Sequence, residues 1–305
     1  MRFSGHESFV CRYAWLPKAY RAVVEDPSAF ANVEKAMVTL GVGKNMVRSI
    51  RFWVEVMGAV ASRSDRTLEP THFGEAVFGE GGFDPFLEDA RTLWLLHWNL
   101  SSQAENPLFA WNFLLYKWPY AELTRSEALA AFMRETGSLD RPHSSVTLAQ
   151  HLDVFLRTYV APESWTGNKE ESLDCPLAEL ELLQNVGDRR VDGSGRREPV
   201  YAFRREPKPE VTTGIFEYCL YDCWNRHHGP EGTITYRDVA ISPGSIGQAF
   251  KLPEDEIRER LDVYAERDTF RPFNYRPSAV QGLLSRRDVG DWDPLAAVYE
   301  EDCDV

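Results

Sequence analysis

The sequence predicts a mainly α-helical fold with small β-hairpins. We expect an N-terminal winged helix-turn-helix-like unit, a helical body and a second winged-helix-like C-terminal domain. Three observations lead to this prediction. Apolar residues recur at helical spacing along much of the chain, a glycine-bearing turn separates two short helical patterns near the N-terminus, and the last third runs from helical patterns into a hairpin pattern. With 305 residues and 43% hydrophobic content, the chain can bury the cores of two compact domains.

The first unit, residues 1–78, contains the helix-turn-helix pattern. Helices are expected at residues 17–24, 31–40 and 44–57, and a strand or turn at 68–74. Between the second and third helices stands Gly41-Val42-Gly43, and glycine is the residue that most readily ends a helix. A helix, a three-residue turn and a second helix match the spacing of a helix-turn-helix.

Three further segments follow. Residues 79–160 predict an aromatic-rich helical body, with helices at 87–100, 108–118, 124–136 and 147–158. Residues 161–210 are polar and interrupted by glycine, which is typical of a hairpin or linker. Residues 211–305 predict helices at 215–225 and 253–266, a hairpin over 271–284 and an acidic tail.

Charge is distributed unevenly along the chain. The net charge is −13, yet residues 1–51 hold eight Lys and Arg against four Asp and Glu, a local charge of +4. A basic lobe on an acidic body can bind DNA at one face while the rest of the molecule repels it. The sequence therefore allows double-stranded DNA as a partner.

Several classes of protein are disfavoured. The N-terminus has no signal-peptide pattern and no apolar run reaches membrane-spanning length, so we expect a cytoplasmic protein without membrane contact. Five irregularly spaced cysteines fit a reducing compartment. No phosphate loop, dinucleotide fingerprint or Gly-x-Ser-x-Gly motif is present, so no nucleotide cofactor is expected.

The candidate DNA-binding residues are Lys44, Asn45, Arg48 and Arg51. Lys44, Arg48 and Arg51 share one face of the third helix, opposite its apolar residues. Lysine and arginine would contact phosphates or guanine edges, and asparagine can pair with adenine. The alternative is a solvated basic helix face.

A second candidate site is the N-terminal motif with His6, Glu7 and Arg12, which places an acid/base pair and a cation within seven residues. His6 and Glu7 are adjacent, however, so their side chains diverge on a helix or a strand, which argues against joint action on one atom. The alternative is an N-terminal strand capped by polar residues.

Two candidate metal sites remain. Asp84, Glu88 and Asp89 could bind Mg²⁺ or Mn²⁺ for phosphodiester cleavage, although acidic residues at a helix start also complement the helix dipole. Cys219, Cys223 and His227 lie along one helix face and could bind a metal, although a buried apolar face explains the same spacing.

Three motifs together resemble a known family. They are Phe3-Ser4-Gly5-His6-Glu7-Ser8-Phe9 with Arg12-Tyr13, then Leu40-Gly41-Val42-Gly43-Lys44-Asn45-Met46-Val47 running into Ser49-Ile50-Arg51-Phe52-Trp53, and finally Asp84-Pro85-Phe86-Leu87-Glu88-Asp89 with Thr92-Leu93-Trp94-Leu95-Leu96-His97-Trp98. A weaker echo is Ser242-Pro243-Gly244-Ser245 leading to Phe250-Lys251-Leu252. The motifs resemble the domain-of-unknown-function family that includes the B protein of the Ssp DNA phosphorothioation systems.

The resemblance implies a role in bacterial antiphage defence. It implies a DNA nickase that opens a strand so that sulfur can replace a non-bridging phosphate oxygen. It also implies three partners: a cysteine desulfurase, an ATP-pyrophosphatase-like sulfurtransferase and an ATPase. No catalytic residue is carried over from the family. The alternatives are a non-catalytic DNA-binding adaptor that recruits the sulfur-transfer enzymes, and a pure protein-interaction scaffold.

Overall fold

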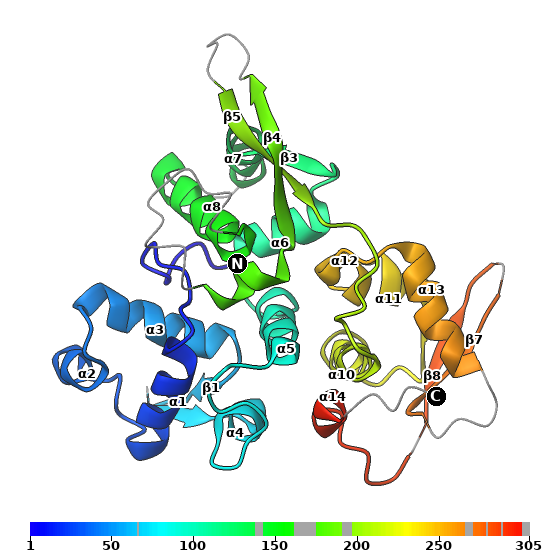
Figure 1. Ribbon diagram of the computed structural model, residues 1–305, viewed down its shortest axis with the longest axis horizontal. Helices are drawn as coiled ribbons and strands as arrows, with labels where there is room; N and C mark the ends of the chain where they lie inside the picture. The colour runs from blue at the N-terminus through cyan, green and yellow to red at the C-terminus, as the bar shows by residue number, and fades with distance from the viewer. Residues whose placement is uncertain are drawn as a thin grey trace. The chain divides into compact units, whose positions relative to one another are not determined.

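The computed structural model describes residues 1–65, 67–137, 143–161, 175–190, 197–265, 271–278, 280–287 and 289–300. Helices dominate this part of the chain, and three small antiparallel sheets accompany them (Figure 1). This confirms the predicted mainly helical fold with hairpins. Within the described ranges, none of the helices combines the length and the apolar character that crossing a membrane requires.

The chain forms two compact units. Unit 1 comprises Met1–Glu88, Leu108–Ala110 and Trp118–Arg204, and unit 2 comprises Asp89–Pro107, Trp111–Lys117 and Arg205–Val305. Neither unit is one continuous segment of sequence. Helix α6 (Phe109–Asn112) spans a point where the chain passes from one unit to the other.

Unit 1 begins with three helices, a two-stranded sheet and a fourth helix. These are α1 (Trp15–Glu25), α2 (Val33–Leu40), α3 (Lys44–Val56), β1 (Val60–Ser62), β2 (Leu68–Pro70) and α4 (His72–Phe78). Asn32 caps α2 by accepting from two backbone N–H groups, and Gly41 ends it with a φ of 65°, a left-handed conformation that glycine adopts without strain. Strands β1 and β2 pair in antiparallel register, Val60 opposite Pro70.

The second half of unit 1 is a strand, two helices and a hairpin. The elements are β3 (Glu122–Thr124), α7 (Arg125–Thr136), α8 (Ser145–Tyr159), the 3₁₀ turn η3 (Pro176–Leu180), β4 (Leu183–Arg190) and β5 (Arg197–Phe203). The strand order is β3-β5-β4, so the first strand pairs with the last. Thr124 and Glu127 form a reciprocal capping box where β3 leads into α7. In Figure 1 the hairpin β4–β5 extends beyond α7 and α8.

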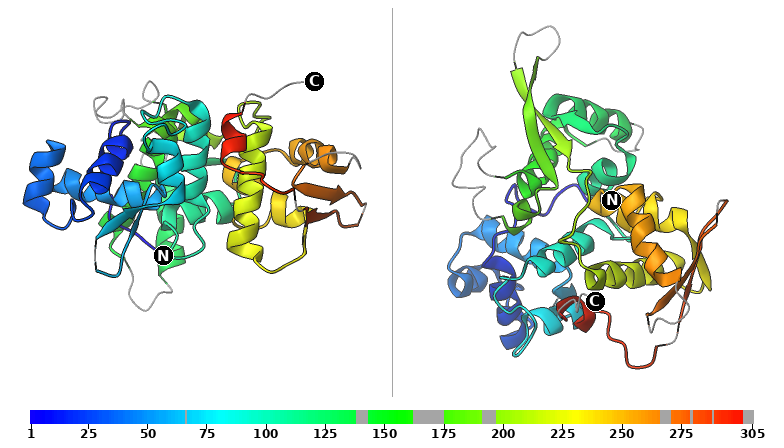
Figure 2. Two further views of the ribbon diagram at one scale, coloured as in Figure 1. Left: turned by 90° about the horizontal axis from the view of Figure 1, so that it is seen from below. Right: turned by 45° about the vertical axis from the view of Figure 1, so that its right-hand side comes forward.

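Unit 2 contains the same succession of strand, helices and hairpin, and two long helices precede it in the sequence. Its elements are α5 (Ala90–Ser101), the π-helical turn η1 (Phe113–Lys117), α10 (Thr213–Cys223), η4 (Trp224–His228), β6 (Thr233–Thr235), α11 (Tyr236–Ala240), α12 (Ile246–Phe250), α13 (Glu254–Asp262), η5 (Val263–Ala265), β7 (Phe273–Arg276), β8 (Leu283–Arg286) and α14 (Ala296–Tyr299). The strand order β6-β8-β7 matches that of unit 1, and Thr235 and Asp238 repeat the capping box. Figure 2 shows the hairpin β7–β8 beside α13.

The cores of the two units are aromatic. In unit 2, Trp94 and Trp98 of α5 pack on Phe250 of α12, with ring centres 5.1 Å and 6.0 Å apart. The indole N–H of Trp98 donates to the Asp222 carboxylate at 2.7 Å. In unit 1, Phe3 and Phe132 both contact the ring of Phe109.

Several short elements were missed by the sequence analysis. Strand β3 lies inside the segment expected to be a helical body, and helix α4 begins within residues 68–74, which were expected to be only a strand or turn. The short helices η3, α12 and α14 were not expected either. Parts of the polar segment (162–174 and 191–196) and the end of the acidic tail (301–305) lie outside the described residues. The four-segment division of the chain stays a prediction.

Candidate nucleic-acid interface

Helix α3 is held in place by its apolar face. Val47, Ile50 and Trp53 are at most 2% exposed, and the Trp53 indole N–H donates to the Phe9 carbonyl at 3.1 Å. Burying these side chains stabilises unit 1 and fixes the orientation of α3 about its own axis. The opposite face is thereby turned to solvent.

The four predicted DNA-binding residues lie along that solvent face, and their surroundings differ. Lys44, Asn45 and Arg48 are exposed, whereas Arg51 is half-buried. The Arg51 guanidinium pairs with the Glu55 carboxylate at 3.1 Å and lies 3.4 Å from the Ser62 hydroxyl. Lys44 and Arg48 therefore offer positive charge to a ligand, while Glu55 partly neutralises Arg51.

A groove of about 490 Å³ lies beside the glycine turn. Its walls come from residues 12–15, from α1, from residues 40–42 and from the inner side of α3, including Met46. Arg12 and Lys18 both line it, and none of its described lining residues is Asp or Glu. Lys18 donates to the carbonyl of Leu40 at 2.6 Å, which ties α1 to the end of α2. Lys18 was not singled out from the sequence, because no spacing rule relates it to the turn.

The N-terminal motif packs against the inner side of α3. Gly5 has a φ of +119°, and a Cβ atom there would lie 2.5 Å from the Phe52 ring. Only glycine fits this contact without rearrangement. The Phe52 ring also carries the Arg2 guanidinium over its face, 4.9 Å from the ring centre. The motif thus fills a close-packed junction with α3.

His6 is buried, and its ring is engaged on both sides. Nε2 lies 3.0 Å from Nδ1 of His151 in α8, and Nδ1 accepts from the Ser8 N–H at 3.2 Å. His151 in turn accepts from the Ala110 N–H at 3.0 Å. Burial, together with the charge of Arg157, lowers the pKa of His6 to about 4. His6 is therefore neutral at pH 7 and occupied by internal contacts.

The other residues of that candidate site point elsewhere. Glu7 is exposed and has a φ of 47°, in a tight turn that also includes Ser8. Arg12 stacks on the Trp15 ring, 5.6 Å from its centre, and lines the groove. The structure thus places Glu7 in solvent, Arg12 in the groove and His6 in the interior.

The three predicted metal-binding carboxylates are in separate surroundings. Asp84 is buried and accepts from the Glu88 N–H at 2.7 Å, while Glu88 is exposed. Asp89 caps α5, and both of its oxygens contact the Arg91 guanidinium, the closest at 2.7 Å. Among the described residues, no group of three or more His, Cys, Asp and Glu side chains is arranged to hold a metal ion. These carboxylates therefore do not present a ready ligand set.

Cys219 and Cys223 are buried thiols on α10. Burial raises the pKa of Cys219 well above its ordinary value and that of Cys223 to about 12, with the negative charge of Asp222 acting in the same direction. Both side chains are thus protonated at pH 7, whereas metal binding requires thiolates. The ring of His227 lies against Gly244 instead.

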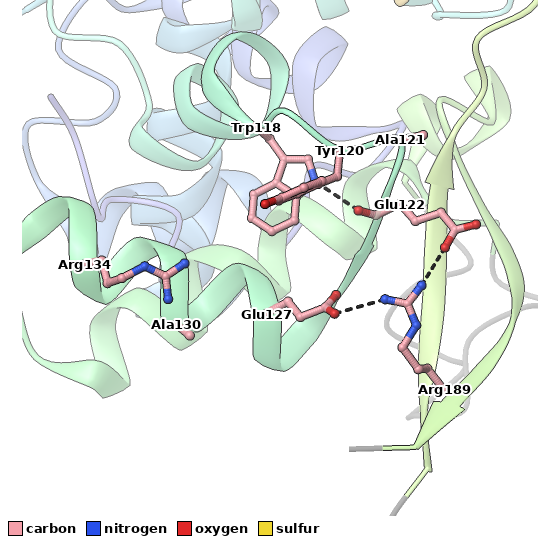
Figure 3. A pocket seen from close by; sticks show the side chains of 8 residues that line it. All are labelled: Trp118, Tyr120, Ala121, Glu122, Glu127, Ala130, Arg134 and Arg189. Atoms are coloured by element: carbon pink, nitrogen blue, oxygen red, sulfur yellow. Dashed lines mark hydrogen bonds and ion pairs between the residues drawn. The ribbon is translucent and has the colours of Figure 1, made fainter. Parts of the chain in front are cut away.

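A further cavity, not expected from the sequence, lies in unit 1. It has a volume of about 610 Å³ and is lined by Trp118, Tyr120, residues of β3 and α7, and Arg189 of β4 (Figure 3). Figure 3 shows Arg189 held between Glu122 and Glu127, at 2.6 Å and 3.0 Å. The two carboxylates already supply Arg189 with partners, so this arginine does not require an anionic ligand.

Comparison with known proteins identifies relatives along nearly the whole chain. The model of the family described as a protein of unknown function, DUF4007, matches residues 3–297. A crystal structure described as magnesium ion-bound SspB is 28% identical in sequence, with a TM-score of 0.80 over 92% of this chain and 82% of that one. A second SspB crystal structure is 26% identical, with a TM-score of 0.78 over 97% and 85% of the two chains. No curated protein matches. The extent of the family match shows that the chain belongs to the DUF4007 family.

Proposed function

We propose that this chain is a DNA-binding nicking endonuclease that acts in DNA phosphorothioate modification and antiphage defence. The observation that carries the DNA-binding part is the exposed face of α3, where Lys44, Asn45 and Arg48 follow a glycine turn. In a winged helix the corresponding helix enters the major groove and the following hairpin lies beside it. Strands β1 and β2 follow α3 along the chain, which is compatible with such a hairpin. Similarity to SspB structures supports a role in the Ssp system.

Within this proposal the residues have distinct roles. Lys44 and Arg48 contact phosphates, and Asn45 is placed to pair with an adenine edge. Arg12 and Lys18 add positive charge in the groove beside the turn. Arg51 contributes less than Arg48, because Glu55 already pairs with it.

The observations that support strand cleavage do not identify the residues that would carry it out. One of the similar structures contains magnesium, which supports magnesium or manganese as a requirement for nicking. The described Asp84 and Asp89 carboxylates are engaged by backbone and guanidinium groups. We therefore assign no metal ligands.

That same engagement favours a second candidate, a non-catalytic DNA-binding adaptor. His6, Asp84 and Asp89 all serve internal contacts that explain their presence without catalysis. An adaptor would recruit a cysteine desulfurase, an ATP-pyrophosphatase-like sulfurtransferase and an ATPase to DNA. These partners belong to the proposal for either function.

A plasmid assay distinguishes the two candidates. Purified protein is incubated with supercoiled plasmid, with and without Mg²⁺ or Mn²⁺. Wild type is compared with Lys44→Ala/Arg48→Ala and with Arg134→Ala/Arg190→Ala, which removes two exposed charges elsewhere in unit 1. For a nickase we expect metal-dependent open-circle product that falls at least about tenfold in the first variant and persists in the second.

Intact plasmid under every metal, with a salt-sensitive gel shift lost only in Lys44→Ala/Arg48→Ala, would identify an adaptor. Absence of any gel shift by wild type would contradict both candidates.

A further inference from the structure

A second, smaller cavity lies in unit 2, against the hairpin β7–β8. Its volume is about 200 Å³, and its walls include Tyr221 of α10, Phe273 of β7, Arg286 and Arg287 near the end of β8, and Trp292. Two of these side chains are cationic, and none of the described residues that line the cavity is Asp or Glu. The cavity is therefore a positively charged recess with aromatic walls.

Arg286 is the unusual residue of this recess. Its guanidinium carbon lies 4.6 Å from the centre of the Trp224 ring and 5.3 Å from that of Tyr221, so two aromatic faces fix its position. Its Nε and Nη2 atoms are enclosed and have no hydrogen-bond partner among the described residues. A guanidinium has five N–H donors and is charged at every physiological pH, so leaving it without an acceptor is costly.

Three other arginines of the same unit have carboxylate partners. Arg226 pairs with Asp222 at 2.5 Å, Arg260 with Glu256 at 2.6 Å and Arg271 with Glu217 at 3.2 Å. Each of these half-buried cations has a carboxylate from its own unit, as Arg189 has in the cavity of Figure 3. Arg286 is rigidly held without such a partner, and burial lowers its pKa. Arg286 thus differs from these three arginines, because it has no carboxylate partner among the described residues.

Arg287 adds a second cation and is itself positioned. Its Nη2 donates to the Asn274 side-chain oxygen at 2.9 Å, which ties it to β7. Phe273, next to Asn274, lies with its ring nearly parallel to that of Trp224, 16° apart. The recess is therefore built by several elements that keep two guanidinium groups near one space.

We propose that this recess binds a phosphate group through Arg286 and Arg287. Planar guanidinium groups match phosphate oxygens in paired hydrogen bonds. Because Nε and Nη2 of Arg286 are enclosed, the Arg286 side chain must shift towards the recess for a phosphate to supply their missing acceptors. A volume of about 200 Å³ is below the roughly 300–1,000 Å³ of pockets that enclose drug-sized ligands, so a single phosphate fits better than a whole nucleotide.

The phosphate can come from two sources, free inorganic phosphate or a phosphodiester of DNA. The second source rests on the proposed DNA-binding function and would give unit 2 its own contact with the sugar-phosphate backbone of DNA. The first does not depend on that function, so the two proposals can fail separately.

The test uses the full chain and three variants. Arg286→Gln removes the charge, Arg286→Met keeps the aliphatic stem against Trp224, and Arg237→Gln removes an exposed charge elsewhere in unit 2 as a matched control. Thermal unfolding is measured in 10 mM sodium phosphate and in sodium chloride of equal ionic strength. We expect phosphate to raise the unfolding temperature of wild type and Arg237→Gln, and to leave both Arg286 variants unchanged.

A second arm measures binding of a 20-base-pair duplex by fluorescence anisotropy over a range of salt concentrations. If the phosphodiester is the ligand, both Arg286 variants weaken binding severalfold and reduce the slope of log affinity against log salt by about 1. If only the thermal arm depends on Arg286, the ligand is free phosphate. Equal behaviour of wild type and both Arg286 variants in the two arms would overturn the proposal.

Discussion

His6 and His151 join two segments that lie 145 positions apart in the chain. Each ring has one nitrogen beside a backbone N–H, that of Ser8 for His6 and that of Ala110 for His151, so a proton added at that nitrogen would have no acceptor. Burial also disfavours the charged form, and it lowers the pKa of His151 well below its ordinary value. Protonation of either ring is therefore disfavoured in the folded protein.

Acid should consequently destabilise the protein before its carboxylates titrate. The pKa of His6, and that of the buried His97, is about 4 in the folded chain and 6.5 in the unfolded chain. Between these values the unfolded chain binds more protons, so stability is complete above pH 6.5 and falls as the pH drops towards 4. Each pKa unit corresponds to about 1.4 kcal/mol, which gives about 3 kcal/mol for each residue.

Urea unfolding between pH 7.5 and 4.5 measures this loss. His6→Gln should flatten the pH dependence, whereas His72→Gln, at an exposed position, should leave it unchanged. A wild-type protein equally stable at pH 7 and pH 4.5 would contradict the expectation.

Sequence patterns predict how neighbouring side chains are directed better than they predict which distant residues surround them. The adjacency of His6 and Glu7 showed that they diverge, and the structure places one inside and the other in solvent. The partner of His6 could not be predicted, because nothing local relates it to His151. That Arg286 has no carboxylate partner in the described part of the chain could not be predicted from the sequence either. It depends on the side chains that three separate elements contribute to one recess.

At the scale of elements, helix α3 carries two arginines, Arg48 and Arg51, whose contributions to DNA binding can be compared directly. Arg48 and Arg51 lie on the same helix face, but of the two only Arg51 has a carboxylate partner among the described residues. In a duplex-binding titration, Arg48→Ala should reduce the salt slope by about 1 and weaken binding by about 1–3 kcal/mol. Arg51→Ala should have a clearly smaller effect, because the ion pair with Glu55 already offsets its charge.

The comparison is decided by anisotropy titrations of both variants with one duplex at several salt concentrations. Equal losses in the two variants would show that Glu55 releases Arg51 on binding. No loss in either would remove α3 from the interface.

Helices with clear apolar periodicity were predicted closely, and the turn before α3 was found from its glycines. Strand β3 was missed because it is three residues long and pairs with a strand far along the chain. Its polar and apolar residues carry no strand signal of their own. Local patterns predict elements, but they do not predict which distant strands pair.

At the scale of the whole molecule, unit 2 depends on two segments that lie within the first 204 residues. Helix α5 is buried along nearly its full length, and within its unit His97 contacts the Ala249 carbonyl at 2.9 Å. A fragment of residues 1–204 lacks α10 and α12, against which α5 packs. We expect this fragment to expose the tryptophans of α5 and to self-associate.

Size-exclusion chromatography and binding of a hydrophobic dye compare the fragment with the full chain. A monomeric fragment with full helicity and no dye binding would show that unit 1 holds α5 by itself.

The strand order shared by the two units has a consequence for synthesis on the ribosome. Leu123 of β3 pairs with Tyr201, which is translated 78 residues later, and Ile234 of β6 pairs with Leu284, 50 residues later. At roughly 5–20 residues per second, β3 waits about 4–16 s for its partner, while a hairpin forms within about 10 μs. The nascent chain therefore holds an unpaired strand for seconds in each of these two sheets, a period in which a chaperone or a neighbouring chain can reach it first.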